Sequence, residues 1–244
     1  MSPESGKSDN AAAPRNFYAR SGKRMLDVLM ALPILLIFAL PMLFIALLVK
    51  LEDGEEVFYR QERIGRDGRP FHLIKFRSMV VGAEHKGAGI RVMEHDSRVS
   101  GIGRFLRKTS LDELPQLFNV IKGDISIVGP RPGLRFQVDL YDENQRGRLL
   151  VRPGITGWAQ VNGRNTIDWE RRIQLDLEYI RRLSLAMDLL VLLKTIPTVL
   201  YSSDVIATSD YWGDKLRART AQRHEGEEVK ESTPSSGDPV DPAD

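Results

Sequence analysis

The sequence of 244 residues contains no cysteine. This absence excludes a disulfide framework, a thiolate metal site and a cysteine nucleophile, and it agrees with a chain that faces a reducing compartment. The net charge of +2 is too close to zero to indicate a nucleic-acid-binding protein. The sequence also lacks an internal repeat, a Walker motif and a dinucleotide-binding fingerprint, so the common nucleotide-binding folds are not indicated.

The strongest positive signal is an apolar run at residues 28–49, which is free of charged side chains. As a helix it would be about 33 Å long, which matches a hydrocarbon core of roughly 30 Å. Pro33 and Pro41 each remove a helical hydrogen bond, so we expect the helix to bend or break within the membrane. Basic residues flank both ends of the run, so the positive-inside rule does not place the two ends on opposite faces of the membrane. A re-entrant hairpin is the favoured interpretation, and one kinked spanning helix is the alternative.

Two adjacent carboxylates, Asp112 and Glu113, stand where a second helix is expected to begin. Ser110 or Asp112 could cap this helix. Pro115 suits its first turn, and Gly123 is placed to end it. Because a helix N-terminus favours anions, one carboxylate could attack a phosphorylated substrate there while the other holds a metal. An ordinary capping box formed by Ser110 and Glu113 is the alternative.

Several cations are candidates for phosphate binding. Guanidinium groups suit this task because their paired N–H donors match the oxygens of a phosphate. For each cation the alternative is a solvated strand or helix face, or a turn. The candidates lie on an expected strand, before the carboxylate pair, between two prolines, and in a glycine-rich loop: Lys75 and Arg77, Arg107, Arg131, and Arg164.

Six motifs, in one order, carry a resemblance to a known family. They are KR-x-x-D at 23–27, RQER-x-G at 60–65, KFRSM at 75–79, LDELPQ at 111–116, GDISIVGPRP at 123–132 and RPGITG at 152–157. From Lys23 to Tyr201 the sequence resembles the bacterial sugar transferases, the small monotopic phosphoglycosyl transferases. Each motif is weak alone, but six in this order are highly specific, and they favour the catalytic interpretation of the carboxylate pair.

The resemblance implies a membrane-bound enzyme that moves a sugar 1-phosphate from a nucleotide diphosphate sugar, usually a UDP-sugar, to polyprenol (undecaprenyl) phosphate and releases UMP. Such a reaction initiates polysaccharide or glycoconjugate assembly. In the family the aspartate is the nucleophile, which forms a covalent phosphosugar intermediate, and the glutamate helps to bind Mg²⁺. These roles map to Asp112 and Glu113. The other matched residues are implied to contact the substrates: Asp188, Arg107, Arg131 and Arg164.

The expected fold is α+β and mostly helical, with an N-terminal re-entrant membrane hairpin and a small cytoplasmic or interfacial catalytic domain. Within that domain we expect residues 56–60 and 71–76 to form a strand hairpin, with an Asp-Gly turn between them, and residues 125–128 to form a buried strand. The four segments of the chain are a flexible N-terminus at 1–22, the membrane helix at 23–50, the catalytic domain with amphipathic interfacial helices at 51–215, and a disordered tail at 216–244.

The implied partners are a nucleotide-sugar donor, a polyprenol phosphate acceptor and membrane lipids, without nucleic acid, and a homodimer is left open. The implied location is the bacterial inner (cytoplasmic) membrane, with the catalytic domain on the cytoplasmic face. Two alternatives are a one-step transfer through a ternary complex, with Asp112 as a base, and a non-catalytic membrane-anchored scaffold. The sequence leaves the identity of the sugar open.

Overall fold

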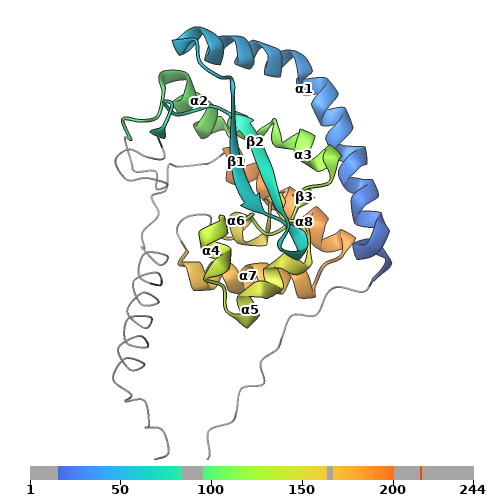
Figure 1. Ribbon diagram of the computed structural model, residues 1–244. Coiled ribbons are helices and arrows are strands. Elements are labelled where there is room, and N and C mark those ends of the chain that lie inside the picture. Colours follow the sequence, from blue (N-terminus) through green and yellow to red (C-terminus); the bar gives the residue numbers. More distant parts are fainter. Residues whose placement is uncertain (1–15, 84–95, 164–166, 201–214, 216–244) are drawn as a thin grey trace, which may run out of the picture. The chain divides into compact units, whose positions relative to one another are not determined.

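The computed structural model describes residues 16–83, 96–163 and 167–200, together with Lys215 (Figure 1). The chain divides into two compact units, Met1–Ser209 and Asp210–Asp244, and Lys215 is the described residue of the second. The first unit is an α+β body in which helices predominate, as the sequence predicts. Its helices are α1 (Lys23–Asp53), α2 (Gly101–Thr109), α3 (Gln116–Lys122), α4 (Arg135–Asp139), α5 (Glu143–Arg146), α6 (Trp158–Val161), α7 (Trp169–Arg181) and α8 (Leu185–Leu200).

The apolar N-terminal run forms one continuous helix, α1. Together with the preceding turn η1 (Tyr18–Gly22), it is long and apolar enough to cross a membrane, judged by length and composition alone. Pro33 and Pro41 lie inside the helix without ending it. Figure 1 shows that α1 changes direction along its length, as two missing N–H donors allow. The helix therefore bends but does not break, and the re-entrant topology stays a prediction.

Both ends of α1 are attached to the same body. Near the N-terminal end, the Lys23 ammonium lies 2.5 Å from the Asp188 carboxylate on α8. At the C-terminal end, the Asp53 carboxylate lies 2.5 Å from the guanidinium of Arg77, which follows β2. Away from the body, apolar side chains of α1 point outward: Leu36, Ile37 and Leu40 are 69%, 71% and 77% exposed. Such an apolar surface indicates membrane association.

Two small sheets accompany the helices. Strands β1 (Phe58–Ile64) and β2 (Pro70–Phe76) pair antiparallel along their full length, so the predicted hairpin is confirmed. Asp67 and Gly68 turn the chain between them, and both have positive φ, 56° and 74°, which suits an Asp-Gly turn. Strands β3 (Ser126–Val128) and β4 (Gly154–Thr156) pair in parallel. Each residue of β3 is buried, as predicted for this segment.

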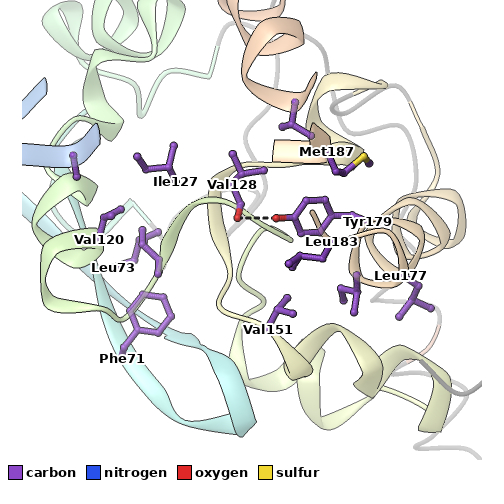
Figure 2. Close-up of a cluster of buried hydrophobic side chains, with 14 of the residues drawn as sticks. Phe71, Leu73, Val120, Ile127, Val128, Val151, Leu177, Tyr179, Leu183 and Met187 are labelled. Carbon is purple, nitrogen blue, oxygen red and sulfur yellow. Dashed lines mark hydrogen bonds between the residues drawn. The ribbon is translucent and has the colours of Figure 1, made fainter. Parts of the chain in front are cut away.

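The core consists of two buried clusters, and α1 contributes to both. The larger cluster joins β2, α3, β3, α7 and α8, and Figure 2 shows much of it. There the hydroxyl of Tyr179 donates a hydrogen bond of 3.2 Å to the carbonyl of Val128. The N-terminal half of α1 supplies Ala31 to this cluster. The smaller cluster contains Met42, Ile45 and Val49 from the C-terminal half of α1, with Phe76 and Leu106.

Candidate active site

The carboxylate pair, Asp112 and Glu113, lies on the short turn η4 (Leu111–Glu113) between α2 and α3. Ser110 before it has φ 58° and ψ 17°, a left-handed conformation that is uncommon for a residue with a side chain. The Ser110 side chain makes no capping hydrogen bond. The capping box of Ser110 and Glu113 is therefore not formed, and helix capping does not explain the carboxylate pair.

The predicted helix begins later than the sequence suggests. Pro115 directly precedes the first residue of α3, Gln116, and no side chain caps the helix. Gly123 ends it with φ 95°, as predicted. The two carboxylates thus stand before α3 on a turn of their own rather than inside its first turn. Apolar contacts hold α3 in place behind the carboxylate pair, because Leu117 and Val120 of α3 are buried in the larger cluster.

Asp112 is 7% exposed, and its carboxylate has no hydrogen-bond donor among residues 16–83, 96–163 and 167–200. Burial and the negative charge of Glu113 raise the pKa of Asp112 to about 6. The positive charges of Lys75, Arg107 and Arg131 oppose this rise. At pH 7 roughly nine tenths of the group remains ionised. Asp112 is therefore a buried carboxylate whose negative charge is offset by nearby cations rather than by direct hydrogen bonds from the described residues.

Glu113 is directly paired with a cation. The Arg131 guanidinium donates a charge-assisted hydrogen bond of 2.6 Å to Glu113 Oε1. The side chains are partly exposed, 23% for Glu113 and 44% for Arg131. The pair therefore remains open to a ligand that approaches from solvent, in contrast to Asp112.

The loop that carries Arg131 is fixed at four consecutive carbonyl groups. Its two prolines lack N–H donors, so the loop must use its carbonyls for backbone hydrogen bonds. As a result, four hydrogen bonds hold the backbone around Arg131, while the Arg131 guanidinium donates to Glu113. The carbonyls of Pro130, Arg131, Pro132 and Gly133 accept hydrogen bonds from the Gly154 N–H (2.9 Å), Arg148 Nη2 (3.0 Å), Arg63 Nη1 (3.1 Å) and the Ile64 N–H (3.0 Å), respectively.

Two further cations complete the group. The Lys75 ammonium on β2 lies 5.2 Å from the centre of the Tyr59 ring, a cation–π contact. Burial lowers the pKa of Lys75, and the negative charge of Asp112 opposes that effect. Arg107 in the last turn of α2 adds a positive charge that acts on both Lys75 and Asp112. The structure thus brings five predicted residues together: Asp112, Glu113, Lys75, Arg107 and Arg131.

Arg77 does not join this group. It lies two residues after Lys75, just beyond the end of β2, where its guanidinium pairs with Asp53 and its Nε donates to the Glu56 carbonyl at 2.5 Å. These contacts attach the C-terminal end of α1 to the strand. Arg164 lies outside the described residues.

Asp188 is also placed elsewhere. It is 1% exposed, and its carboxylate accepts hydrogen bonds from Tyr18 (2.5 Å), Lys23 (2.5 Å) and Tyr179 (2.6 Å). These donors come from η1, α1 and α7, so Asp188 joins three elements to α8. A substrate role for Asp188 stays a prediction, and the geometry shows a structural role.

Two arginines that sequence reasoning did not single out support the site. Arg63 belongs to the RQER-x-G motif at 60–65, so the sequence contained a signal that could have identified this arginine. Arg148 is 4% exposed, and it donates to the Asp176 carboxylate at 2.9 Å and to the Tyr141 hydroxyl as well as to the carbonyl of Arg131. No local pattern marks Arg148, because its ion-pair partner lies 28 residues away on α7.

The donor set fits a magnesium ion shared with a substrate. In the described part of the chain, no three His, Cys, Asp or Glu side chains gather into a metal-binding group. Mg²⁺ is often held by only one or two carboxylates together with substrate phosphates and water. The hard, partly exposed carboxylate of Glu113 suits that mode, with the Asp112 carboxylate beside it.

Comparison with known proteins gives one consistent result. Residues 18–202 match the family described as bacterial sugar transferase. The uncharacterized sugar transferase EpsL of Bacillus subtilis is 44% identical over 194 residues, which cover 80% of this chain and 95% of EpsL. The exopolysaccharide production protein ExoY of Rhizobium meliloti is 41% identical over 194 residues, 74% of this chain and 86% of ExoY.

A longer relative carries a more specific name. The UDP-glucose:undecaprenyl-phosphate glucose-1-phosphate transferase of Escherichia coli is 43% identical over 182 residues, which cover 71% of this chain and 39% of that enzyme. The family match spans most of the chain and includes each of the clustered residues. The chain therefore belongs to the bacterial sugar transferases, a family of enzymes.

Proposed function

We propose that the protein transfers a sugar 1-phosphate from a nucleotide diphosphate sugar, a UDP-sugar in the simplest case, to polyprenol (undecaprenyl) phosphate. The product is a polyprenyl-diphosphate-sugar, on which a polysaccharide or glycoconjugate is then built. The name of the E. coli relative supports this reaction. The observation that carries the proposal is the buried Asp112 carboxylate, which has no hydrogen-bond donor among the described residues and lies beside Glu113 and three cations.

The transfer proceeds in two half-reactions. An oxygen of the Asp112 carboxylate attacks the phosphorus that carries the sugar, the P–O bond to the nucleoside monophosphate breaks, and UMP leaves with the bonding electron pair. Asp112 is then an acyl phosphate of the sugar. An oxygen of polyprenol phosphate attacks the same phosphorus and releases the Asp112 carboxylate. Each half-reaction forms one P–O bond and breaks one, so the atoms and electrons balance.

The surrounding charges make the attack feasible. A carboxylate approaches an anionic diphosphate poorly unless positive charge neutralises the phosphate oxygens. Arg131, Lys75 and Arg107 supply three positive charges that already act on Asp112. The carbonyl contacts that fix the Arg131 loop hold its backbone in place before the substrate arrives.

Glu113 is the proposed protein ligand for Mg²⁺. When bound with the phosphate oxygens of the donor, the metal would reduce the negative charge on the diphosphate and stabilise the leaving phosphate. Glu113 also holds the Arg131 guanidinium at 2.6 Å, which positions this arginine beside the carboxylate that attacks.

We infer the membrane placement from the way in which both ends of α1 are attached. A helix that crossed a bilayer would carry its two ends to opposite faces, whereas Lys23 and Asp53 are paired with Asp188 and Arg77 of one body. This supports a re-entrant α1 with both ends on the cytoplasmic face of the bacterial inner membrane. An enzyme at that interface can meet a water-soluble donor and a lipid acceptor.

The test uses the purified full-length protein with Mg²⁺ and UDP-sugars, first without lipid. We expect UMP in an amount comparable to the enzyme and a sugar phosphate on Asp112, detected by mass spectrometry after rapid quenching. Polyprenol phosphate then discharges the adduct. If UMP forms only when the lipid is present, and no adduct is found, the one-step ternary mechanism replaces this one. A panel of UDP-sugars identifies the donor.

The competing proposal is that the protein is a membrane-anchored scaffold without catalytic activity, not an enzyme. It predicts no UMP release with any donor, with or without polyprenol phosphate. The family is one of enzymes, and the five clustered residues supply two carboxylates and three cations, so we favour the transferase.

A further inference from the structure

The charge of one arginine beside the active site is not used by the mechanism proposed above. Arg63 lies on β1, and its Nη1 donates to the Pro132 carbonyl at 3.1 Å, next to Arg131. Its Nη2 donates to Gln61 Oε1 at 2.6 Å, and its Nε is buried without a hydrogen-bond partner among the described residues. Both hydrogen bonds of the Arg63 guanidinium therefore go to neutral oxygens.

No carboxylate in the described part of the chain forms an ion pair with Arg63. Two other arginines that are removed from solvent do have such a partner: Arg148 Nη2 lies 2.8 Å from Asp176, and Arg98 Nη2 lies 2.6 Å from Asp96. A cation that is taken out of water without a counter-charge destabilises the fold. Proteins keep such a group where it serves a function, so Arg63 is a candidate for a role in the site.

Arg63 lies within the electrostatic influence of the Glu113 and Arg131 pair. Burial and the like charge of Arg131 lower the pKa of Arg63 to about 10, and the negative charge of Glu113 is among the effects that oppose this shift. The Arg63 guanidinium therefore remains charged at pH 7. Glu113 also neutralises Arg131, with which it forms an ion pair of 2.6 Å. One carboxylate is thus shared by two guanidinium groups, and positive charge is left over.

The excess positive charge favours an anion at Arg131 rather than at Arg63 itself. The Arg131 side chain is 44% exposed and can contact a ligand from solvent, whereas the Nε of Arg63 is buried. The charge of Arg63 raises the electrostatic potential around its neighbour, and this effect is stronger in a partly buried environment than in water. Arg63 therefore acts on a ligand through Arg131.

We propose that Arg63 is a positioning residue of the donor site, whose positive charge strengthens the binding of a diphosphate to Arg131. Without the donor, Glu113 balances only one of the two arginines. The diphosphate of the donor supplies the missing negative charge, and Glu113 then becomes available for Mg²⁺. The inference rests on the proposed function for the identity of the donor, whereas the effect of Arg63 on a diphosphate can be measured separately.

The test measures the binding of inorganic pyrophosphate to the full-length protein in detergent with Mg²⁺, by isothermal titration calorimetry. Pyrophosphate presents a diphosphate without nucleotide or sugar, so the measurement does not depend on transfer. We expect Arg63→Gln, which removes the charge but keeps a hydrogen-bond donor, to weaken the affinity about tenfold. Arg63→Lys keeps the charge but cannot reproduce the two hydrogen bonds of the guanidinium fork, and it should stay within about threefold of the unmodified protein.

Arg60→Gln is the matched control for the loss of one positive charge. Arg60 lies on the same strand as Arg63, but at an exposed position. Solvent and salt screen the charge of an exposed side chain, so this variant should have little effect on pyrophosphate affinity. The melting temperature of Arg63→Gln should be no lower than that of Arg60→Gln, because the substitution removes a charge that has no counter-ion.

Several results would overturn this role of Arg63. Equal losses of affinity in Arg63→Gln and Arg63→Lys would show that hydrogen bonding matters rather than charge, and equal losses in Arg63→Gln and Arg60→Gln would show an unspecific effect of surface charge. A lower melting temperature with unchanged affinity would limit Arg63 to a structural role, and failure of the unmodified protein to bind pyrophosphate would remove the ligand. Single-turnover UMP release, measured in parallel, reports on the transferase proposal, so the two proposals can fail separately.

Discussion

Asp112 and Asp188 are both buried aspartates, but their surroundings differ. Asp188 is 1% exposed and accepts hydrogen bonds from a lysine and two tyrosines. Asp112 is 7% exposed and has no donor in the described part of the chain, only nearby positive charge. A carboxylate whose lone pairs are occupied by protein donors stabilises the fold. One whose lone pairs are left available is suited to react.

The largest effect that this comparison predicts is on catalysis. Asp112→Asn should reduce UMP release by at least about 10³-fold, because an amide cannot form the acyl phosphate. Its melting temperature should stay equal or rise, since the substitution removes a buried charge. Single-turnover UMP assays and thermal unfolding in detergent measure the two quantities. Near-normal UMP release by Asp112→Asn would show that Asp112 is not the nucleophile.

Asp188→Asn should lower the stability of the protein rather than remove its catalytic activity. It leaves the buried Lys23 ammonium without its counter-charge, and breaking such a pair costs about 3–5 kcal/mol of unfolding free energy. Denaturant unfolding in micelles measures the loss. Lys23→Met combined with Asp188→Asn should recover part of it, because the buried ammonium is then removed together with its partner. A stable Asp188→Asn protein that cannot release UMP would instead support the predicted substrate role.

An intermediate effect is expected at Arg148. Arg148→Met removes the donor to the Arg131 carbonyl and leaves the buried Asp176 without its ion-pair partner. Besides a loss of stability, we expect KM for the UDP-sugar to rise about tenfold in the folded fraction, because Arg131 is no longer held in place. Arg146→Met, at an exposed position two residues earlier, is the matched control. Unchanged KM in Arg148→Met would limit Arg148 to a structural role.

The smallest effect is expected at the other end of α1. The Arg77 and Asp53 pair is more exposed than the Lys23 and Asp188 pair, so solvent weakens it. Arg77→Gln should lower the melting temperature less than Asp188→Asn does, with UMP release preserved. Arg60→Gln, on the exposed face of β1, is the control for loss of one surface charge. If Arg77→Gln lost UMP release and Arg60→Gln did not, Arg77 would be a substrate-binding residue, as the sequence predicted.

The sequence predicted those features that depend on neighbours in the chain. The Asp-Gly turn marked the hairpin, and Gly123 marked the end of α3. Lys75 and Arg77 show the limit of such reasoning. Alternation along a strand places both on one side, yet one acts on Asp112 and the other pairs with Asp53, because β2 ends at Phe76 and Arg77 lies beyond it, beside the C-terminal end of α1.

Other features depend on partners far away in the sequence. The role of Asp188 is set by Lys23 and Tyr18, 165 and 170 residues earlier. The contact of Arg148 with the Arg131 loop required the tertiary structure, since a buried ion pair has no local sequence pattern. The absence of a capping bond at Ser110 likewise reflects its left-handed backbone, which composition does not reveal.

The separation between Lys23 and Asp188 also bears on the order of synthesis. The ribosome releases the apolar helix first, whereas its counter-ion on α8 emerges 165 residues later. The apolar helix is therefore synthesised in full before the ion pair that secures its first turn can form.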